Sequence, residues 1–156
     1  MKEFNRVLAI VLGMLVLTAP HGVATSGAST VTGAVEGPFG AGAAIGPVML
    51  DALEAGTGVL VEPDGSAVGV FHAVLRGHSL GQPQDITIDG SVNQGSVAGD
   101  GSTTFSGTAT VDLGGGIPPL TGVWFSVTAA DGSMTLVVDS TVLPVVELTA
   151  GVLVVD

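Results

Sequence analysis

The residues best suited to chemistry lie between positions 72 and 85. His72, Arg76 and His78 share one parity if a strand continues past Leu75, so their side chains would lie on one face. Together with Asp85 beyond the next turn, the two histidines could coordinate zinc or serve a small hydrolase or isomerase, and all four residues could contact a ligand. The spacing is not one of the familiar zinc-ligand pairs. We therefore keep the four residues as ligand-binding candidates and expect no catalytic residue, metal or cofactor; exposed histidines beside acidic neighbours are the simpler interpretation.

Arg76 stands apart because it is the only Lys or Arg after position 6. A lone cation in an acidic chain is expected to find a carboxylate partner. The alternative is that its guanidinium marks a site for an anionic ligand, since it can make a bidentate contact.

Residues 77–81, Gly-His-Ser-Leu-Gly, match the G-x-S-x-G pattern and look like the nucleophile pentapeptide of many lipases and esterases. That site needs a strand before the serine, a helix after it, and a histidine further along the chain. No histidine follows His78, and residues 82–84 are Gln-Pro-Gln. With Gly at 25 of 156 positions, chance explains the match better than catalysis.

Four copies of Asp-Gly-Ser begin at Asp64, Asp89, Asp100 and Asp131. Asp-Gly is typical of tight turns, because Asp tolerates a positive φ and Gly adopts it freely. Clustered aspartates also suit calcium, but neither the EF-hand loop nor the G-G-x-G-x-D repeat is present. The repeats therefore predict turns, except at Asp89, where we prefer a continuous strand and keep a turn at Asp89-Gly90 as the alternative.

The clearest strand spans 103–113, where apolar or small residues alternate with Thr, Ser and Asp over eleven positions. The same alternation predicts strands at 121–129 and 133–143, and Pro144 separates the latter from a last strand at 145–155.

The earlier part of the chain is less regular. Residues 25–57 are rich in Gly and Ala, and we interpret them as a leader of uncertain order or a first strand, with a short helical turn at 48–54. Strands are predicted at 59–62 and 66–75, and one more runs from Asp85 to Asn93, followed by a loop through Asp100. The sequence thus predicts an all-β, antiparallel domain of about seven strands. An up-and-down meander barrel and a two-sheet sandwich both satisfy this pattern.

The amino terminus resembles a secretory signal peptide. Lys2 and Arg6 precede an apolar run from Val7 to Ala19, and Gly22-Val23-Ala24 supplies small residues at a cleavage point. We expect residues 1–24 to be removed, with cleavage after Ala28 as the second choice and an uncleaved anchor as the less favoured alternative. The predicted division is therefore a signal peptide at 1–24, a leader at 25–57 and a β domain at 58–156.

Composition limits the partners of the mature chain. Thirteen carboxylates then face Arg76 alone, a formal charge of −12, which repels nucleic acids and anionic membranes. There is no Cys, so stability must come from packing. Few aromatic residues and no Tyr argue against membrane insertion as a barrel.

These features predict a secreted, non-catalytic β domain with a structural or surface-associated role. Its edge strands, including the apolar run Val152–Val155, are expected to pair with a copy of the chain or with another extracellular protein. The alternatives are a barrel that binds a small apolar ligand and, less favoured, a small enzyme that uses His72, His78 and Asp85.

Overall fold

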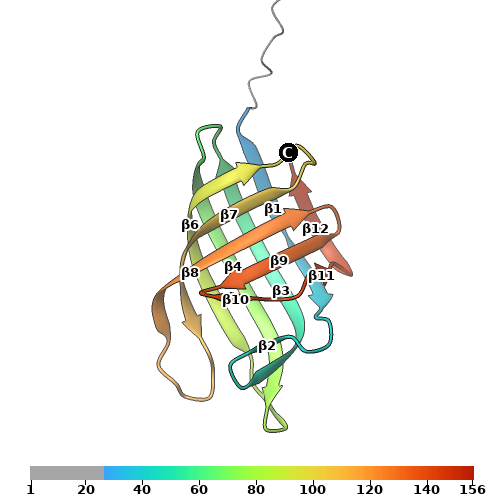
Figure 1. Ribbon diagram of the computed structural model, residues 1–156, viewed down its shortest axis with the longest axis vertical. Helices are drawn as coiled ribbons and strands as arrows, with labels where there is room; N and C mark the ends of the chain where they lie inside the picture. Colours follow the sequence, from blue (N-terminus) through green and yellow to red (C-terminus); the bar gives the residue numbers. More distant parts are fainter. Residues whose placement is uncertain (1–26) are drawn as a thin grey trace, which may run out of the picture.

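Every strand of the computed structural model belongs to one antiparallel sheet that curls into a half-barrel (Figure 1). The structure describes residues 27–156, and that part of the chain contains no helix. The strands are β1 (Ser29–Pro38), β2 (Ala44–Ile45), β3 (Val48–Val61), β4 (Ser66–Ser79), β5 (Gln82–Pro83), β6 (Ile86–Val97), β7 (Thr103–Asp112), β8 (Leu120–Ala130), β9 (Ser133–Val138), β10 (Thr141–Val142), β11 (Val146–Glu147) and β12 (Ala150–Val155). The predicted signal peptide lies outside the described residues.

The two-residue alternation produces these strands. In β7, Phe105, Ala109 and Val111 are buried while Thr108 and Thr110 on the opposite face are exposed. Aliphatic and aromatic residues therefore line the inside of the curl, and Thr, Ser and charged residues line the outside. The all-β, antiparallel prediction is confirmed.

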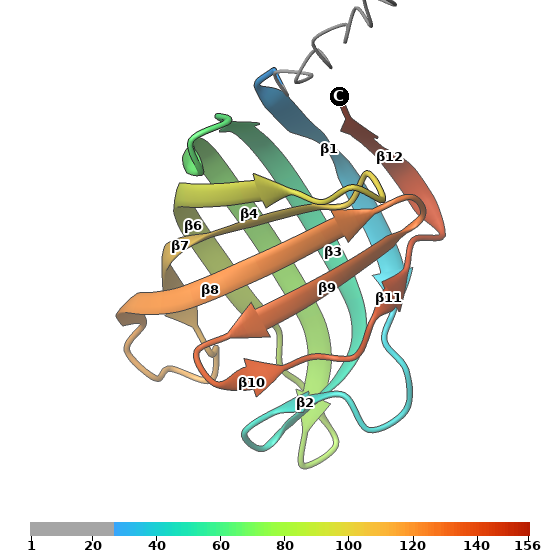
Figure 2. The same ribbon diagram turned by 45° about the horizontal axis from the view of Figure 1, so that its top comes forward.

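The long strands follow one another as an up-and-down meander, with a single exception. The order is β10-β9-β8-β7-β6-β4-β3-β1-β12, so the carboxy-terminal strand pairs with the amino-terminal one. Neighbouring long strands pair residue by residue, and the register shifts only at one local bulge in each of the pairs β3–β4, β4–β6, β6–β7 and β7–β8. This arrangement is a curled sheet, in which the first and last strands lie side by side (Figure 2).

Backbone hydrogen bonds link the β8–β9 part of the curled sheet to β1 through the residues between β11 and β12. The amide of Leu148 donates to the carbonyl of Gly132 at 2.9 Å, and the amide of Thr149 donates to the carbonyl of Glu36 at 2.9 Å. Successive amides of an extended chain point in opposite directions, so these two neighbours bond the β8–β9 turn on one side and β1 on the other. Beyond this joint, β12 pairs with β1 alone.

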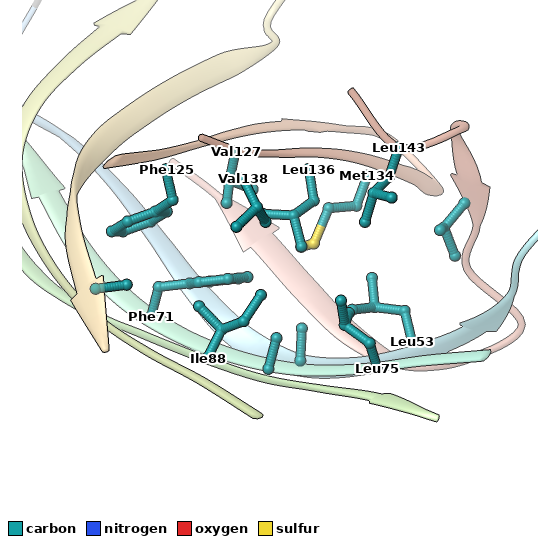
Figure 3. Close-up of a cluster of buried hydrophobic side chains, with 14 of the residues drawn as sticks. Leu53, Phe71, Leu75, Ile88, Phe125, Val127, Met134, Leu136, Val138 and Leu143 are labelled. Carbon is teal, nitrogen blue, oxygen red and sulfur yellow. The ribbon is translucent and has the colours of Figure 1, made fainter. Parts of the chain in front are cut away.

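Side chains from both walls of the curl fill its interior (Figure 3). The Phe71 ring stacks on Phe125 with centroids 5.5 Å apart and meets Phe105 edge-on at 6.0 Å. Leu53 and Leu75 from β3 and β4 are fully buried in the same core. Burial of large apolar side chains of this kind stabilises the fold by roughly 1.5–3 kcal/mol for each of them.

Several predicted boundaries are corrected by the structure. Residues 48–54, predicted as a helical turn, form the first half of β3. β1, which also falls within the Gly-rich stretch 25–57, agrees with the interpretation of that stretch as a first strand. The strand predicted to end at Asn93 continues as β6 to Val97, because it pairs with β7 along its whole length.

The strand predicted at 133–143 is also wrong in its second half. β9 ends at Val138, and the chain reverses at Asp139, which adopts a positive φ of 52°. Asp tolerates this conformation because its short polar side chain costs little there. The predicted break at Pro144 is present, between β10 and β11.

Candidate functional site

Strand β4 carries three of the four predicted site residues on its outward face. Phe71, Ala73 and Leu75 point into the core, so His72, Arg76 and His78, which share the opposite parity, are exposed. The predicted common face of these three residues is confirmed.

Each of the three is paired with a different carboxylate. His72 Nδ1 donates to Asp89 Oδ1 of β6 at 2.7 Å, and the two residues lie directly opposite each other in the sheet. Arg76 Nη2 lies 2.6 Å from Glu54 Oε1 of β3. His78 Nδ1 donates to Asp51 Oδ2 at 3.0 Å. The expected carboxylate partner of Arg76 is therefore present, and exposed pairs like these contribute little to stability.

The structure does not bring the predicted set together. His72 and His78 are six residues apart on one extended strand, which separates them by roughly 20 Å. Asp85 lies between β5 and β6, where its Oδ1 accepts the Gly77 amide at 3.4 Å. Within residues 27–156 no three His, Asp or Glu side chains are placed to share a metal ion. A zinc site or an acid–base pair built from these four residues has no geometric support.

The Gly-His-Ser-Leu-Gly segment forms a hairpin instead of a nucleophile elbow. Ser79 pairs with Gln82 across the two-residue loop Leu80-Gly81, whose φ angles are 51° and 77°. Two positive φ values are typical of a type I′ turn between antiparallel strands. Ser79 is therefore followed by a second strand, whereas the elbow requires a helix.

Two of the Asp-Gly-Ser repeats form the same capped turn. Oδ1 of Asp64 accepts the hydroxyl of Ser66 at 2.6 Å and its amide at 2.9 Å, and Asp100 does the same with Ser102 at 2.7 and 2.9 Å. The serine hydroxyl first, and then the serine amide, hold the pKa of each aspartate below its ordinary value of 3.8. Of the other two repeats, that at Asp131 forms the β8–β9 turn and that at Asp89 continues β6 without turning.

A shallow depression of about 560 Å³ lies on the outside of the sheet over β12, β1, β3 and β4. Its lining includes Glu36, Glu54 and His72. Gly56 contributes no side chain at this point, which leaves the floor low. His78 and Asp85 lie elsewhere, so the depression does not unite the predicted site residues.

The second candidate surface is the free edge of β12. Thr30 and Asp156 exchange both backbone hydrogen bonds, at 2.9 and 3.0 Å. In an antiparallel pair such bonds form at every second residue, so the backbone amides and carbonyls of Val152, Val154 and Asp156 point towards β1. The amides and carbonyls of Leu153 and Val155 therefore point away from β1, and no other described strand pairs with them.

Two depressions follow this free edge from the joint at residues 148–149 towards the carboxy terminus. The one nearer the joint, of about 310 Å³, lies between β12 and the β8–β9 turn and includes Asp131 and Leu153 in its lining. The other, of about 660 Å³, reaches the β6–β7 loop and includes Asp100, Asp131 and Val155. We call the gap made by these two depressions the β12 wedge.

The sequence indicated part of this surface and missed the rest. The apolar run Val152–Val155 was expected at an edge, and β12 is an edge strand with Val152 67% exposed. The approach of Asp100 and Asp131 to β12 was not predicted. Both belong to Asp-Gly-Ser turns, and that signal placed them at hairpin ends without saying which strand the ends would face.

No protein-family model, curated protein or solved structure matches the chain. A helix with the length and hydropathy to cross a bilayer is not found in residues 27–156. The candidate surfaces for function are therefore the outer face of β4 and the free edge of β12.

Proposed function

We propose that this chain is a secreted, non-catalytic β domain with a structural or surface-associated role, and that it acts by accepting an extended segment of another chain at the free edge of β12. The observation that carries the proposal is this edge. The amides and carbonyls of Leu153 and Val155 have no strand partner among the described residues and lie in a register that allows strand addition.

The composition of β12 supports this use of the edge. Natural proteins usually protect an edge strand with Lys, Pro, a bulge or a covering loop. The sequence of β12, Ala-Gly-Val-Leu-Val-Val, contains no charged residue and no Pro, and Val152 and Val154 are exposed. An apolar edge of this kind is stabilised when another strand covers it.

The alternatives receive less support. A barrel that holds a small apolar ligand needs an internal cavity, whereas Phe71, Phe105 and Phe125 pack against one another at its centre. A small hydrolase or isomerase needs His72 and His78 in one cleft, and both side chains are about half exposed on the outer face.

Amide hydrogen exchange of the mature domain tests whether the edge is free. Leu153 and Val155 should exchange rapidly, while Val152 and Val154, which bond to β1, should be protected. Equal protection of all four amides in a monomer would contradict the proposal.

Fractionation of the producing cells then tests the role itself. Val155→Pro removes the outward-facing N–H and leaves the bonds of its even-numbered neighbours to β1 intact. We expect the wild type to remain with the cell surface and Val155→Pro to be released into the medium. Val155→Thr keeps the amide and controls for the lost side-chain packing. Equal retention of all three forms would remove the support for strand addition.

A further inference from the structure

The chemistry of the β12 wedge identifies the kind of segment that it accepts. Resting on the proposed function, we infer that the partner is a chain other than a second copy, and that it contributes an extended segment with alternating apolar residues and at least two Lys or Arg side chains. Shape, apolar surface and charge each contribute one part of this inference.

The shape of the wedge fits one extended segment. Its closed end is the joint where Leu148 bonds to Gly132 and Thr149 bonds to Glu36. From there two depressions, of about 310 and about 660 Å³, lie along β12 towards the carboxy terminus. Figure 2 shows the ends of the β6–β7 and β8–β9 hairpins close to β12, which pairs with β1. A strand that enters this gap can hydrogen-bond to β12 and contact those hairpin ends with its side chains.

The edge supplies an apolar stripe on each face. Leu153 and Val155 are partly buried and pack against the core, and Val152 and Val154 project from the opposite face. Side chains of an added strand lie beside those of β12 on both faces. Apolar residues at alternate positions of the partner would therefore extend the core at Leu153 and Val155.

The opposite wall of the wedge is acidic. Asp100 and Asp131 are exposed and line the larger depression, and Asp156 follows the end of β12. The hydrogen bonds from Ser102 lower the pKa of Asp100, so this carboxylate is ionised at neutral pH. Arg76, the only Lys or Arg of residues 27–156, is already paired with Glu54. No Lys or Arg among the described residues is left for these carboxylates, so a partner that carries cations would complement them.

The same charges disfavour a second copy. Residues 27–156 carry thirteen carboxylates and one arginine, so two copies that meet edge to edge bring together domains of charge −12. Like charges across an interface oppose association, while opposite charges steer it and fix the register.

Two synthetic peptides test the inference. The first has ten residues, alternates Val and Thr, and carries a Lys near each end; the second has Glu in place of both Lys residues. Fluorescence anisotropy with the mature domain in 0.05 M NaCl should show at least tenfold tighter binding of the Lys peptide. That preference should decrease in 0.5 M NaCl, since screening weakens exposed charge contacts.

Variants locate the contact. Asp100→Asn combined with Asp131→Asn keeps the turn-forming residue type and the acceptor oxygen, but removes two charges, so it should reduce the preference for the Lys peptide to less than threefold. The matched control is Asp139→Asn combined with Glu62→Gln, which removes two carboxylates outside the wedge and should leave the preference near its original value. Val155→Pro should weaken the binding of the Lys peptide, because it removes an amide that faces the wedge.

The outcomes separate the inference from the proposed function. Equal binding of the two peptides, both weakened by Val155→Pro, would overturn the basic partner and leave strand addition standing. Failure of both peptides to bind, at concentrations where the domain is monomeric, would overturn both. A dimer in sedimentation that Val155→Pro dissolves would identify a second copy as the occupant, contrary to the inference.

Discussion

Thr103 is a buried residue whose hydroxyl group makes no hydrogen bond within the described part of the chain. Its side chain is fully buried at the start of β7, and Oγ1 has no hydrogen-bond partner among the described residues. A hydroxyl removed from water without a partner costs about 1–3 kcal/mol.

Thr103→Val replaces the hydroxyl with a methyl group of similar size. We expect the free energy of unfolding to rise by about 1–2 kcal/mol, because the desolvation cost disappears while the packing remains. Urea denaturation measures the change. Thr103→Ser is the control, since it keeps the hydroxyl and loses the methyl group, and it should be less stable than the wild type. A less stable Val variant would show that Oγ1 has a partner, such as an ordered water molecule.

Replacement of Gly107 and of Gly58, two glycines within strands, by alanine should have opposite effects on stability. A Cβ at Gly107 of β7 would overlap the carbonyl oxygen of Ser91, whereas a Cβ at Gly58 of β3 would meet no atom within 4 Å. Gly107→Ala should therefore lower the free energy of unfolding by about 2–3 kcal/mol. Gly58→Ala should raise it by about 0.4–1 kcal/mol, because alanine has fewer conformations in the unfolded chain. Thermal denaturation of the two variants side by side gives the comparison, and similar changes of one sign would contradict the placement of β7 against β6.

At the scale of elements, the two serine-capped turns should make the free energy of unfolding depend on pH in acid. Asp64 and Asp100 each accept two hydrogen bonds from a serine two residues later, and both have a pKa below 3.8. A carboxylate whose pKa is lowered on folding stabilises the folded state above its unfolded pKa, and this contribution is lost as the pH falls through the folded pKa.

Asp64→Ala combined with Asp100→Ala should therefore reduce stability at pH 6 and lessen the loss of stability between pH 4 and pH 2. Denaturant midpoints across this range measure the effect. Asp139→Asn combined with Glu62→Gln removes the same number of carboxylates, keeps a residue that tolerates the positive φ at position 139, and should keep more of the wild-type acid response. An unchanged slope in the Asp64 and Asp100 variant would mean that these turns do not contribute to it.

The strands with a polar outer face could be predicted from the sequence, and those with a small-residue outer face could not. In β7 every second residue is Thr, Ser or Asp, so the period of two is plain. In β3 the outward positions include Gly56 and Gly58, which hide the alternation, and the first half of the strand was predicted as a helical turn. Pairing of β3 with β1 and β4 along its length decides its conformation, as tertiary context often does.

The candidate sites on β4 and at the β12 wedge depend on how the strands align with one another. The shared face of His72, Arg76 and His78 follows from parity within one strand, which the sequence contains. The pairing of His72 with Asp89 depends on how β4 and β6 align, and the wedge depends on where the chain leaves β9 for β1. Neither is a local property, because each is fixed by hydrogen bonds between segments far apart in the chain.

At the scale of the whole molecule, the uncompensated negative charge acts on every part of the sheet at once. Within residues 27–156, Arg76 forms an ion pair with Glu54 on the outside of β3 and β4, and His72 and His78 hydrogen-bond to exposed carboxylates of β6 and β3. Exposed pairs contribute little, so mutual repulsion of the remaining carboxylates should dominate the response to salt.

The charge predicts that salt stabilises the chain without residues 1–24. Between 0.01 and 0.1 M NaCl the screening length falls from about 30 to about 10 Å, which weakens repulsion between distant carboxylates more than attraction within a contact pair. We expect the free energy of unfolding at pH 7 to rise by about 1 kcal/mol, or roughly 3–6 °C in Tm for a domain of this size. Calorimetry at both salt concentrations measures the shift, and pH 4 is the internal control, because protonation of part of the carboxylates should reduce it. A Tm that falls with added salt would mean instead that the attractive pairs on β4 outweigh the net charge, and the electrostatic case against pairing of two copies at β12 would lose its basis.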